Sequence, residues 1–353
     1  MKASIYFLLL GMSLSIACNN TKPSDSKDAS KSFLSALEIV ETPVKRNHYG
    51  AKYEPIQGVL HGAGQDIDGF NDYTQVLGTE RYPIFYMTYV GITDSKERVA
   101  EWGAGLKREL STMPADVMPQ IGLNMTGGND DGSGQVGSVA EGKFDEQIAI
   151  FIQALQALDR KCYVRIGYEF EGAWNGYEPA GYVASFIKIT QELRAANVEA
   201  ATVWCSGGGS ANFMPWQQLL TYYPGDEWVD WWGIDIFSPE EITDPRLLAF
   251  LQKADEYQKP VMIGETTPRF VGTLGGITSW NAWFKPFFQL VYKNPQIKAI
   301  SYINWDWVFW SDKLGFQWHD WKDARIEQND TISQAYVQEL SKPIFIHSEE
   351  SKK

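Results

Sequence analysis

The order of apolar and amphipathic segments limits the fold of this chain more than any other feature of its sequence. From about residue 56 onward, short apolar runs alternate with segments whose apolar residues recur at helical spacing. The expected strands are 56–65, 82–92, 117–124, 162–169, 201–206, 229–237, 261–265 and 299–305. The expected helices are 68–77, 97–113, 144–158, 181–196, 215–223, 245–257, 278–292 and 332–340.

This alternation predicts an α/β protein with a parallel sheet. Eight strand–helix units in one run close into a (β/α)8 TIM barrel. An open doubly wound sheet is the alternative, but no GxGxxG turn follows the first apolar run. The 353 residues suffice for one barrel domain, which we expect at 41–345, followed by a polar tail at 346–353.

The first 40 residues predict a targeting signal followed by a flexible tether. Lys2, the apolar run 5–16 and the small residues before Cys18 resemble a bacterial lipoprotein signal. We therefore expect a signal peptide at 1–17, lipidation of Cys18, and a flexible polar tether at 18–40. The protein would then lie in the bacterial cell envelope, at the outer membrane, the surface or the periplasmic face, with plain secretion as the alternative. No other membrane contact is expected.

Charge and cysteine content narrow the classes of partner. A net charge of −13 without a basic stripe argues against nucleic-acid binding. Cys162 and Cys205 lie in expected strands, which favours buried free thiols over a disulfide. Asp130 and Asp131 could ligate calcium, but we favour a solvated turn, and no other ligand cluster is evident. We expect a monomer without metal or cofactor.

Two glutamates end expected strands that lie across the barrel from each other. Glu169 ends the strand 162–169, and Glu265 ends the strand 261–265. The active site of a TIM barrel lies at the C-terminal ends of its strands. Glycosidic cleavage needs one protonated carboxyl group for the leaving oxygen and one ionised carboxylate to attack or to activate water. Glu171 is the alternative acid, but it lies further out in the loop, so we favour Glu169.

Other residues at strand ends and in the following loops are candidates for substrate contact. The 14 Trp and 17 Tyr suit sugar rings, because each combines an apolar face with a polar group. The candidates are His61, Tyr89, Asn124, Tyr168, Trp174, Trp204, Trp305 and Trp310. His61 is equally a candidate core histidine. The aromatic residues of 305–321 predict a sugar-binding wall, with a self-packed loop as the alternative.

Two further polar residues belong to these strands. Arg165 is expected below Glu169 on the same strand face, where we favour a structural ion partner over a ligand for an acidic sugar. Asp235 ends the strand 229–237, and the sequence indicates no role for it.

The stretch RIGYEFEGAWNGY at 165–177 resembles the strand-four motif of clan A glycoside hydrolases, above all the family 26 β-mannanases and β-1,3-xylanases. VMIGETTP at 261–268 is similar to the strand-seven nucleophile motif of that clan. The resemblance implies that Glu169 is the acid/base and Glu265 the nucleophile of a retaining mechanism. It also implies that Trp305 stacks beneath the sugar at the point of cleavage. Tyr168 stands where family 26 commonly has His, which leaves the family within the clan open.

We therefore expect a retaining, endo-acting glycoside hydrolase with a polysaccharide or oligosaccharide substrate. The substrate classes are β-linked mannan, β-glucan, xylan and galactan, cleaved by a two-glutamate double displacement. The alternative is a non-catalytic glycan-binding surface lipoprotein on the same scaffold, which would keep the tryptophans without needing the carboxylate pair. The sequence identifies neither the sugar and linkage nor the choice between endo and exo action.

Overall fold

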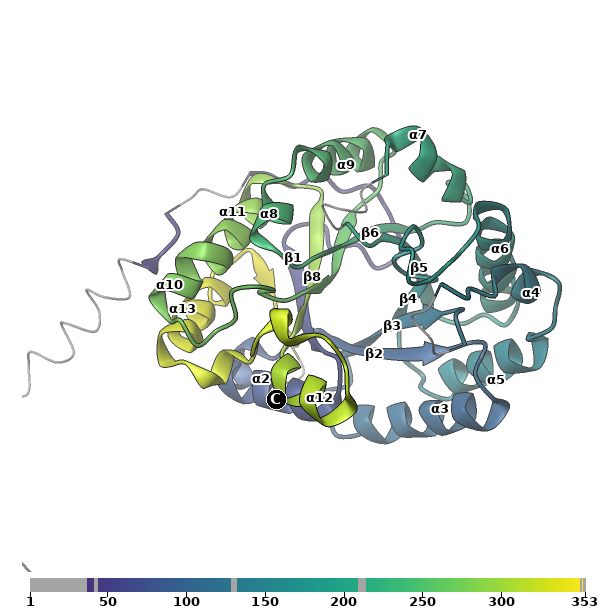
Figure 1. Cartoon of the computed structure of the whole chain (residues 1–353), viewed down its shortest axis with the longest axis horizontal. Coiled ribbons are helices and arrows are strands. Elements are labelled where there is room, and N and C mark those ends of the chain that lie inside the picture. Colours follow the sequence, from purple (N-terminus) through teal and green to yellow (C-terminus); the bar gives the residue numbers. More distant parts are fainter. Residues whose placement is uncertain (1–36, 41–43, 128–131, 209–213, 350, 352–353) are drawn as a thin grey trace, which may run out of the picture. The chain divides into compact units, whose positions relative to one another are not determined.

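A closed parallel barrel forms the centre of the unit Ile39–Lys353, with helices around it (Figure 1). The computed structural model describes residues 37–40, 44–127, 132–208, 214–349 and 351. The sheet runs in the order β2-β3-β4-β5-β6-β7-β8-β1, and the pairing of β1 with β2 closes it. The strands are β1 Val59–Gly64, β2 Phe85–Gly91, β3 Met118–Asn124, β4 Cys162–Ile166, β5 Ala200–Ser206, β6 Trp231–Ile236, β7 Val261–Thr266 and β8 Ile297–Ile303.

The helices cover the outside of this barrel and confirm the predicted TIM fold. They are α2 Ile67–Leu77, α3 Lys96–Leu110, α4 Val136–Ala140, α5 Asp145–Gln156, α6 Pro179–Ala195, α7 Trp216–Leu219, α8 Pro239–Ile242, α9 Pro245–Glu256, α10 Ile277–Ser279, α11 Lys285–Lys293, α12 Trp307–Leu314 and α13 Asp330–Leu340. The predicted helix 278–292 is divided, because a π-helical turn at Trp280–Phe284 separates α10 from α11.

Helix α3 illustrates how the sequence pattern produces these elements. The Ser95 side chain accepts a hydrogen bond from the amide of Arg98, which caps the first turn. Val99, Leu106 and Leu110 recur at helical spacing and are buried. This apolar stripe packs α3 against α5 and the barrel, and the opposite face stays polar.

The barrel interior changes from apolar to polar along the strands. One cluster of buried residues includes Phe85, Tyr163 and Met262, which lie near the starts of β2, β4 and β7. Further along the strands, the Gln120 amide donates a 2.8 Å hydrogen bond to the carbonyl oxygen of Gly264 and accepts one from the Ser301 hydroxyl. The polar layer begins here and leads to the C-terminal ends of the strands.

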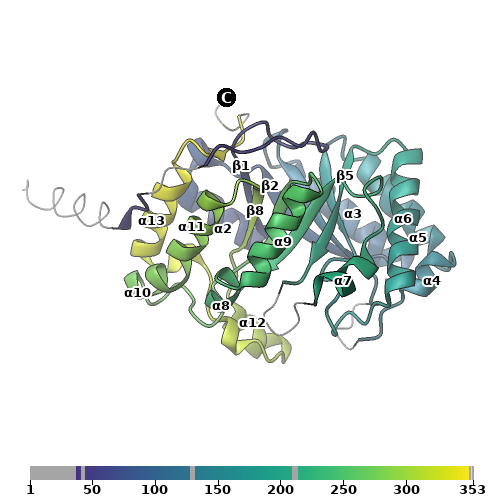
Figure 2. The same cartoon turned by 90° about the horizontal axis from the view of Figure 1, so that it is seen from above.

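The loops that follow the strands lie at one end of the barrel. Helices α8 and α12, which follow β6 and β8, lie together at that end (Figure 2). The short strand β9, Phe345–Ile346, pairs with the first residues of β1, so regular structure extends just past residue 345. Helix α12 lies in a segment for which the sequence predicts a long aromatic loop.

Several sequence predictions concern residues outside the described part of the chain. These are the signal peptide, Cys18, and the pair Asp130 and Asp131. Within the described residues, Cys162 and Cys205 are buried free thiols, as predicted. No helix in that part is long and apolar enough to span a bilayer. The same residues contain no group of three His, Cys, Asp or Glu that could hold a metal ion.

Candidate active site

A pocket of about 860 Å³ lies at the C-terminal ends of the strands. Its walls come from most of the barrel: Gln65 follows β1, Tyr89 belongs to β2, and Gly207 follows β5. Glu169 and Glu265 both line it. The two glutamates singled out in the sequence therefore meet in one cavity, of a size typical for small-molecule and sugar sites.

Glu265 enters the pocket through an irregularity in β7. Ile234 and Ile236 of β6 pair with Ile263 and Thr266 of β7, so β7 carries one extra residue at this point. A side chain at Gly264 would point at Arg165 and Asp235 inside the barrel. Regular alternation would then aim the next residue outward, but the extra residue lets Glu265 face inward as well.

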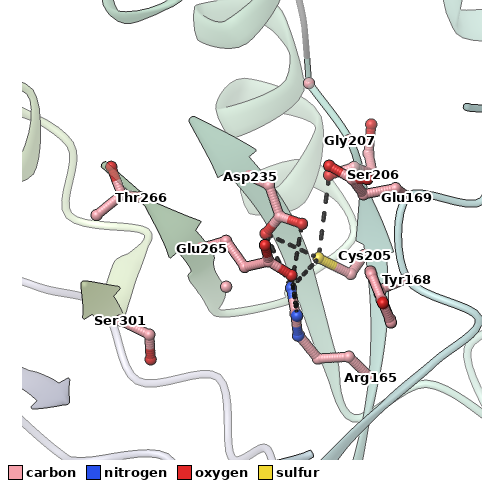
Figure 3. A network of polar contacts seen from close by, with 12 residues as sticks. Arg165, Tyr168, Glu169, Cys205, Ser206, Gly207, Asp235, Glu265, Thr266 and Ser301 are labelled. Atoms are coloured by element: carbon pink, nitrogen blue, oxygen red, sulfur yellow. Dashed lines mark hydrogen bonds and ion pairs between the residues drawn. The ribbon is translucent and has the colours of Figure 1, made fainter. Parts of the chain in front are cut away.

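Arg165 joins two carboxylates below the pocket (Figure 3). Its Nη1 donates hydrogen bonds of 3.0 and 3.1 Å to the two carboxylate oxygens of Asp235. Its Nη2 donates to Oε1 of Glu265. Arg165 and Asp235 are fully buried. Burial opposes the charge on Arg165, but Asp235 and Glu265 outweigh it and raise the arginine pKa. Glu265 therefore has a permanent cation beside one oxygen.

These hydrogen bonds also show where Arg165 and Asp235 lie relative to the pocket. Arg165 lies below the pocket as a structural ion partner, as favoured from the sequence, and it does not line the cavity. Its guanidinium carbon lies 4.8 Å from the ring centre of Tyr168, which lines the pocket. Asp235, whose role was open, is the second anion of the cluster.

Glu169 reaches the pocket from a turn rather than from a strand. β4 ends at Ile166, earlier than the predicted end at Glu169. Gly167 and Glu169 have φ values of 60° and 51°, so the backbone turns in the left-handed region. Oε2 of Glu169 accepts a 2.8 Å hydrogen bond from the indole nitrogen of Trp174.

The surroundings of Glu169 favour its protonated form. Burial raises the pKa of this carboxyl group well above the usual value, and the charges of Asp235, Glu265 and Glu171 raise it further. The Trp174 hydrogen bond opposes these effects. Thus one pocket holds a glutamate whose pKa is raised and another glutamate that is paired with a cation, a combination that would suit an acid and a nucleophile.

Three of the predicted contact residues line the pocket: Tyr89, Tyr168 and Trp174. Trp305 and Trp310 stack on each other at 5.4 Å beside it, and the Trp305 indole donates a 2.8 Å hydrogen bond to Asp66. Asn124 lies half-buried at the end of β3, where its side-chain oxygen accepts weak hydrogen bonds from Thr126.

The positions of two candidates contradict the predicted contact with substrate. Trp204 is fully buried behind the barrel wall, where its ring stacks 4.7 Å from that of Phe170. His61 is also fully buried, and its Nε2 lies 2.8 Å from Nδ1 of His347. Neighbouring strand positions alternate between the inside and the outside of a barrel, and both residues face outward.

Several residues of the pocket are not among the substrate contacts predicted from the sequence. Trp307, Trp318 and Trp321 were foreseen only as part of the aromatic loop, and they do line the cavity. Glu241, Arg269 and Asp320 were missed. The Arg269 guanidinium bonds to Asp320 and lies 4.5 Å from the Trp321 ring. The charged pair therefore ties the loop after β7 to the loop after β8, a contact that no local sequence signal reveals.

Known proteins resemble this chain in sequence. It is 32% identical over 330 residues to the β-1,3-xylanase TXYA of a Vibrio species, covering 85% of this chain and 68% of that protein. It is 30% identical over 323 residues to a β-1,3-xylanase of an Alcaligenes species, covering 84% of this chain and 66% of the relative. No protein-family model matches the sequence.

Solved structures of family 26 share the fold. A modular endo-β-1,4-mannanase of Cellulomonas fimi matches with a TM-score of 0.61 and 16% identity, covering 91% of this chain and 76% of that one. GH26C of a Muricauda species matches with a TM-score of 0.59 and 13% identity, covering 84% and 90%. The chain therefore belongs to the family of the β-1,3-xylanases, and it is a β-glycan-cleaving glycoside hydrolase of clan A with a family 26-like barrel.

Proposed function

We propose that this chain is a retaining, endo-acting β-glycanase with Glu265 as the nucleophile and Glu169 as the acid/base. One observation carries the assignment: the two carboxyl groups share a pocket in opposite electrostatic surroundings. Burial and nearby anions raise the pKa of Glu169, whereas Arg165 binds Glu265 directly. This pattern supports a protonated acid beside an ionised nucleophile.

The mechanism follows from these roles in two steps. A carboxylate oxygen of Glu265 attacks the anomeric carbon, the glycosidic C–O bond breaks, and the leaving oxygen takes the proton of Glu169. Glu265 is then an ester and has lost its charge, so the pKa of Glu169 falls. As a carboxylate, Glu169 accepts a proton from water while the water oxygen attacks the anomeric carbon, which releases Glu265.

We propose a β-1,3-linked xylan as the substrate. The sequence relatives are named as β-1,3-xylanases, and they match across most of this chain. Aromatic rings at the pocket, including those of Trp174, Trp307 and Trp321, provide faces for sugar rings. A neutral polymer also suits a cavity whose lining carries four acidic side chains, those of Glu169, Glu241, Glu265 and Asp320.

The test is hydrolysis of a panel containing β-1,3-xylan, β-1,4-xylan, β-1,4-mannan and β-1,3-glucan. Reducing-end release identifies the substrate, product sizes distinguish endo from exo action, and proton NMR of the first products identifies the retained anomer. Glu169→Gln and Glu265→Gln should each lower turnover by about 10²-fold or more. Glu146→Gln is the matched control, because that carboxylate is 72% exposed and paired with Lys96. Full turnover in either pocket variant would refute the assignment, and absence of hydrolysis on every glycan would leave the binding-protein alternative.

We also propose that the protein is anchored to the cell envelope through a lipid on Cys18. Lys2, the apolar run at 5–16 and the residues before Cys18 support this proposal. Metabolic labelling with a radioactive fatty acid, compared between wild type and Cys18→Ser, tests it. Label in both proteins, or in neither, would contradict the anchor.

A further inference from the structure

We propose that Glu171 is a positioning residue for Glu169. In this proposal, Glu171 fixes the backbone that follows β5, and Gly207 of that backbone forms a wall against the Glu169 side chain. The proposal rests on the acid/base role proposed for Glu169, and it gives a function to the carboxylate that sequence analysis considered as the alternative acid.

The carboxylate of Glu171 is bound to the end of β5. Its Oε1 accepts hydrogen bonds from the Ser206 hydroxyl, from the Gly207 amide at 2.9 Å and from the Gly208 amide at 3.3 Å. Glu171 is only 7% exposed and does not line the pocket. These three donors satisfy Oε1 and hold the side chain and the loop backbone together, whereas the buried Oε2 has no hydrogen-bond partner among the described residues.

The fixed backbone lies directly against Glu169 (Figure 3). A Cβ atom at Gly207 would lie 3.2 Å from Cβ, 3.3 Å from Cγ and 3.5 Å from Cδ of Glu169. The Cα of Gly207 therefore borders this side chain from its base to its carboxyl carbon. The indole nitrogen of Trp174 contacts Oε2 of Glu169. A Cβ at this position would be in tight contact with Glu169, so that Glu169 or the loop would have to move by a few tenths of an ångström.

Glu171 also acts on Glu169 through its charge. Burial, Asp235 and Glu265 make the larger contributions to the raised pKa of Glu169, and Glu171 adds to them. Two variants separate the effect of the Glu171 hydrogen bonds on the position of Glu169 from the effect of the Glu171 charge on its pKa. Glu171→Gln keeps an oxygen that can accept the same three hydrogen bonds but removes the charge, whereas Glu171→Ala removes both.

A purely structural role for Glu171 must be distinguished from positioning. Glu54 offers the matched case, because its Oε2 accepts hydrogen bonds from the amides of Tyr49, Gly50 and Ala51. Glu54 is 8% exposed, but it lies outside the pocket and pairs with Lys298. Glu54→Gln and Glu54→Ala therefore report the effect of losing a buried loop carboxylate without any link to Glu169.

The experiment compares two substrates that differ in their need for an acid. A xylo-oligosaccharide has a poor leaving group that requires protonation, whereas a 2,4-dinitrophenyl β-xylobioside leaves without it. The ratio kcat/KM reports glycosidic bond cleavage for both. Glu171→Ala should lower kcat/KM by about tenfold or more on the oligosaccharide, with an effect below about threefold on the dinitrophenyl substrate. KM should change little.

The conservative variant provides a second readout. Glu171→Gln should recover most of the oligosaccharide activity, and it should move the alkaline limb of the kcat/KM profile to lower pH, because one anion beside Glu169 is gone. Gly207→Ala should reproduce the leaving-group dependence of Glu171→Ala. Gly137→Ala is its control, since a Cβ there meets no atom within 4 Å.

The results separate the two proposals. Equal losses on both substrates, or no loss on either, in folded Glu171→Ala would overturn the positioning role. If Glu171→Ala does not fold, Gly207→Ala tests the positioning role instead. A ratio of the two kcat/KM values, oligosaccharide over dinitrophenyl substrate, that stays at the wild-type value in Gly207→Ala would then overturn this role. Inactivity of the wild type on both substrates, or full activity of Glu169→Gln on the oligosaccharide, would instead refute the proposed function.

Discussion

The Trp174 indole nitrogen donates a 2.8 Å hydrogen bond to Oε2 of Glu169. Both residues belong to the loop after β4, and both line the pocket. This bond favours the ionised form of Glu169, and therefore acts against the burial and the neighbouring anions that raise its pKa. A single side chain thus limits how strongly the proposed acid holds its proton.

Trp174→Phe tests this relationship. Without the indole N–H, the pKa of Glu169 should rise further, so the alkaline limb of the kcat/KM profile should move to higher pH. A pH series of initial rates measures the limb independently of the overall rate. Trp102→Phe serves as the control, because that indole donates to Thr88 away from the pocket and its loss should leave the profile unchanged.

Glu169→Gln should stabilise the folded protein at neutral and alkaline pH. The folded state keeps the Glu169 proton to higher pH than the unfolded chain, whose carboxyl group titrates near the ordinary value of 4.5. The free energy of unfolding therefore falls as pH rises above that value, and the Gln variant escapes this loss. Urea unfolding should show equal stabilities below pH 4.5 and a more stable variant at about pH 8. A gap that is constant with pH would contradict the raised pKa.

Arg165→Met should destabilise the fold strongly. It leaves Asp235 and Glu265 buried without their cation, which costs about 3–5 kcal/mol. The loss should be smaller in acid, where the carboxyl groups can take up protons. Lys143→Met is the control, because its pair with Glu141 is 62% and 66% exposed and should contribute no more than about 1 kcal/mol. Urea titrations at two pH values compare the free energies of unfolding of the wild type and the two variants.

Gly264→Ala should lower the free energy of unfolding by about 1–3 kcal/mol through overpacking. The added Cβ would lie 2.6 Å from Nη1 of Arg165 and 2.7 Å from Oδ1 of Asp235. Gly105→Ala, inside helix α3, should instead stabilise by up to about 1 kcal/mol, since its nearest neighbour would be 3.7 Å away. Thermal unfolding should show a lower melting temperature for Gly264→Ala and a higher one for Gly105→Ala. Equal shifts of the melting temperature in the two variants would contradict the packing argument.

The fold was predictable because the spacing of apolar residues differs clearly between the segments that form strands and those that form helices. The buried stripe of α3 and the continuous apolar run of β5 were both readable from residue order. The same property of β5 explains the error at Trp204. A parallel strand buried on both faces shows no polar alternation, so its sequence does not reveal that Cys205 faces inward and Trp204 outward.

The helix α12 was missed although it carries two terminal signals. The Asp306 side chain accepts a hydrogen bond from the amide of Phe309, and Gly315 ends the helix with φ 76°. The aromatic side chains of this segment favour a sugar-binding loop as strongly as its two caps favour a helix. The ion cluster of Arg165 was only partly foreseen, because Asp235 lies on another strand and only the closed barrel brings them together.

The extra residue in β7 has a consequence for anyone who transplants this chemistry to another barrel. Two consecutive positions, Gly264 and Glu265, both face the interior, so copying Glu265 onto a regularly pleated strand would send its carboxylate into the surrounding helices. Deleting one residue from this part of β7 should likewise inactivate the enzyme without removing any functional side chain. The irregularity therefore belongs to the proposed site as much as the glutamate does, and a graft must carry both.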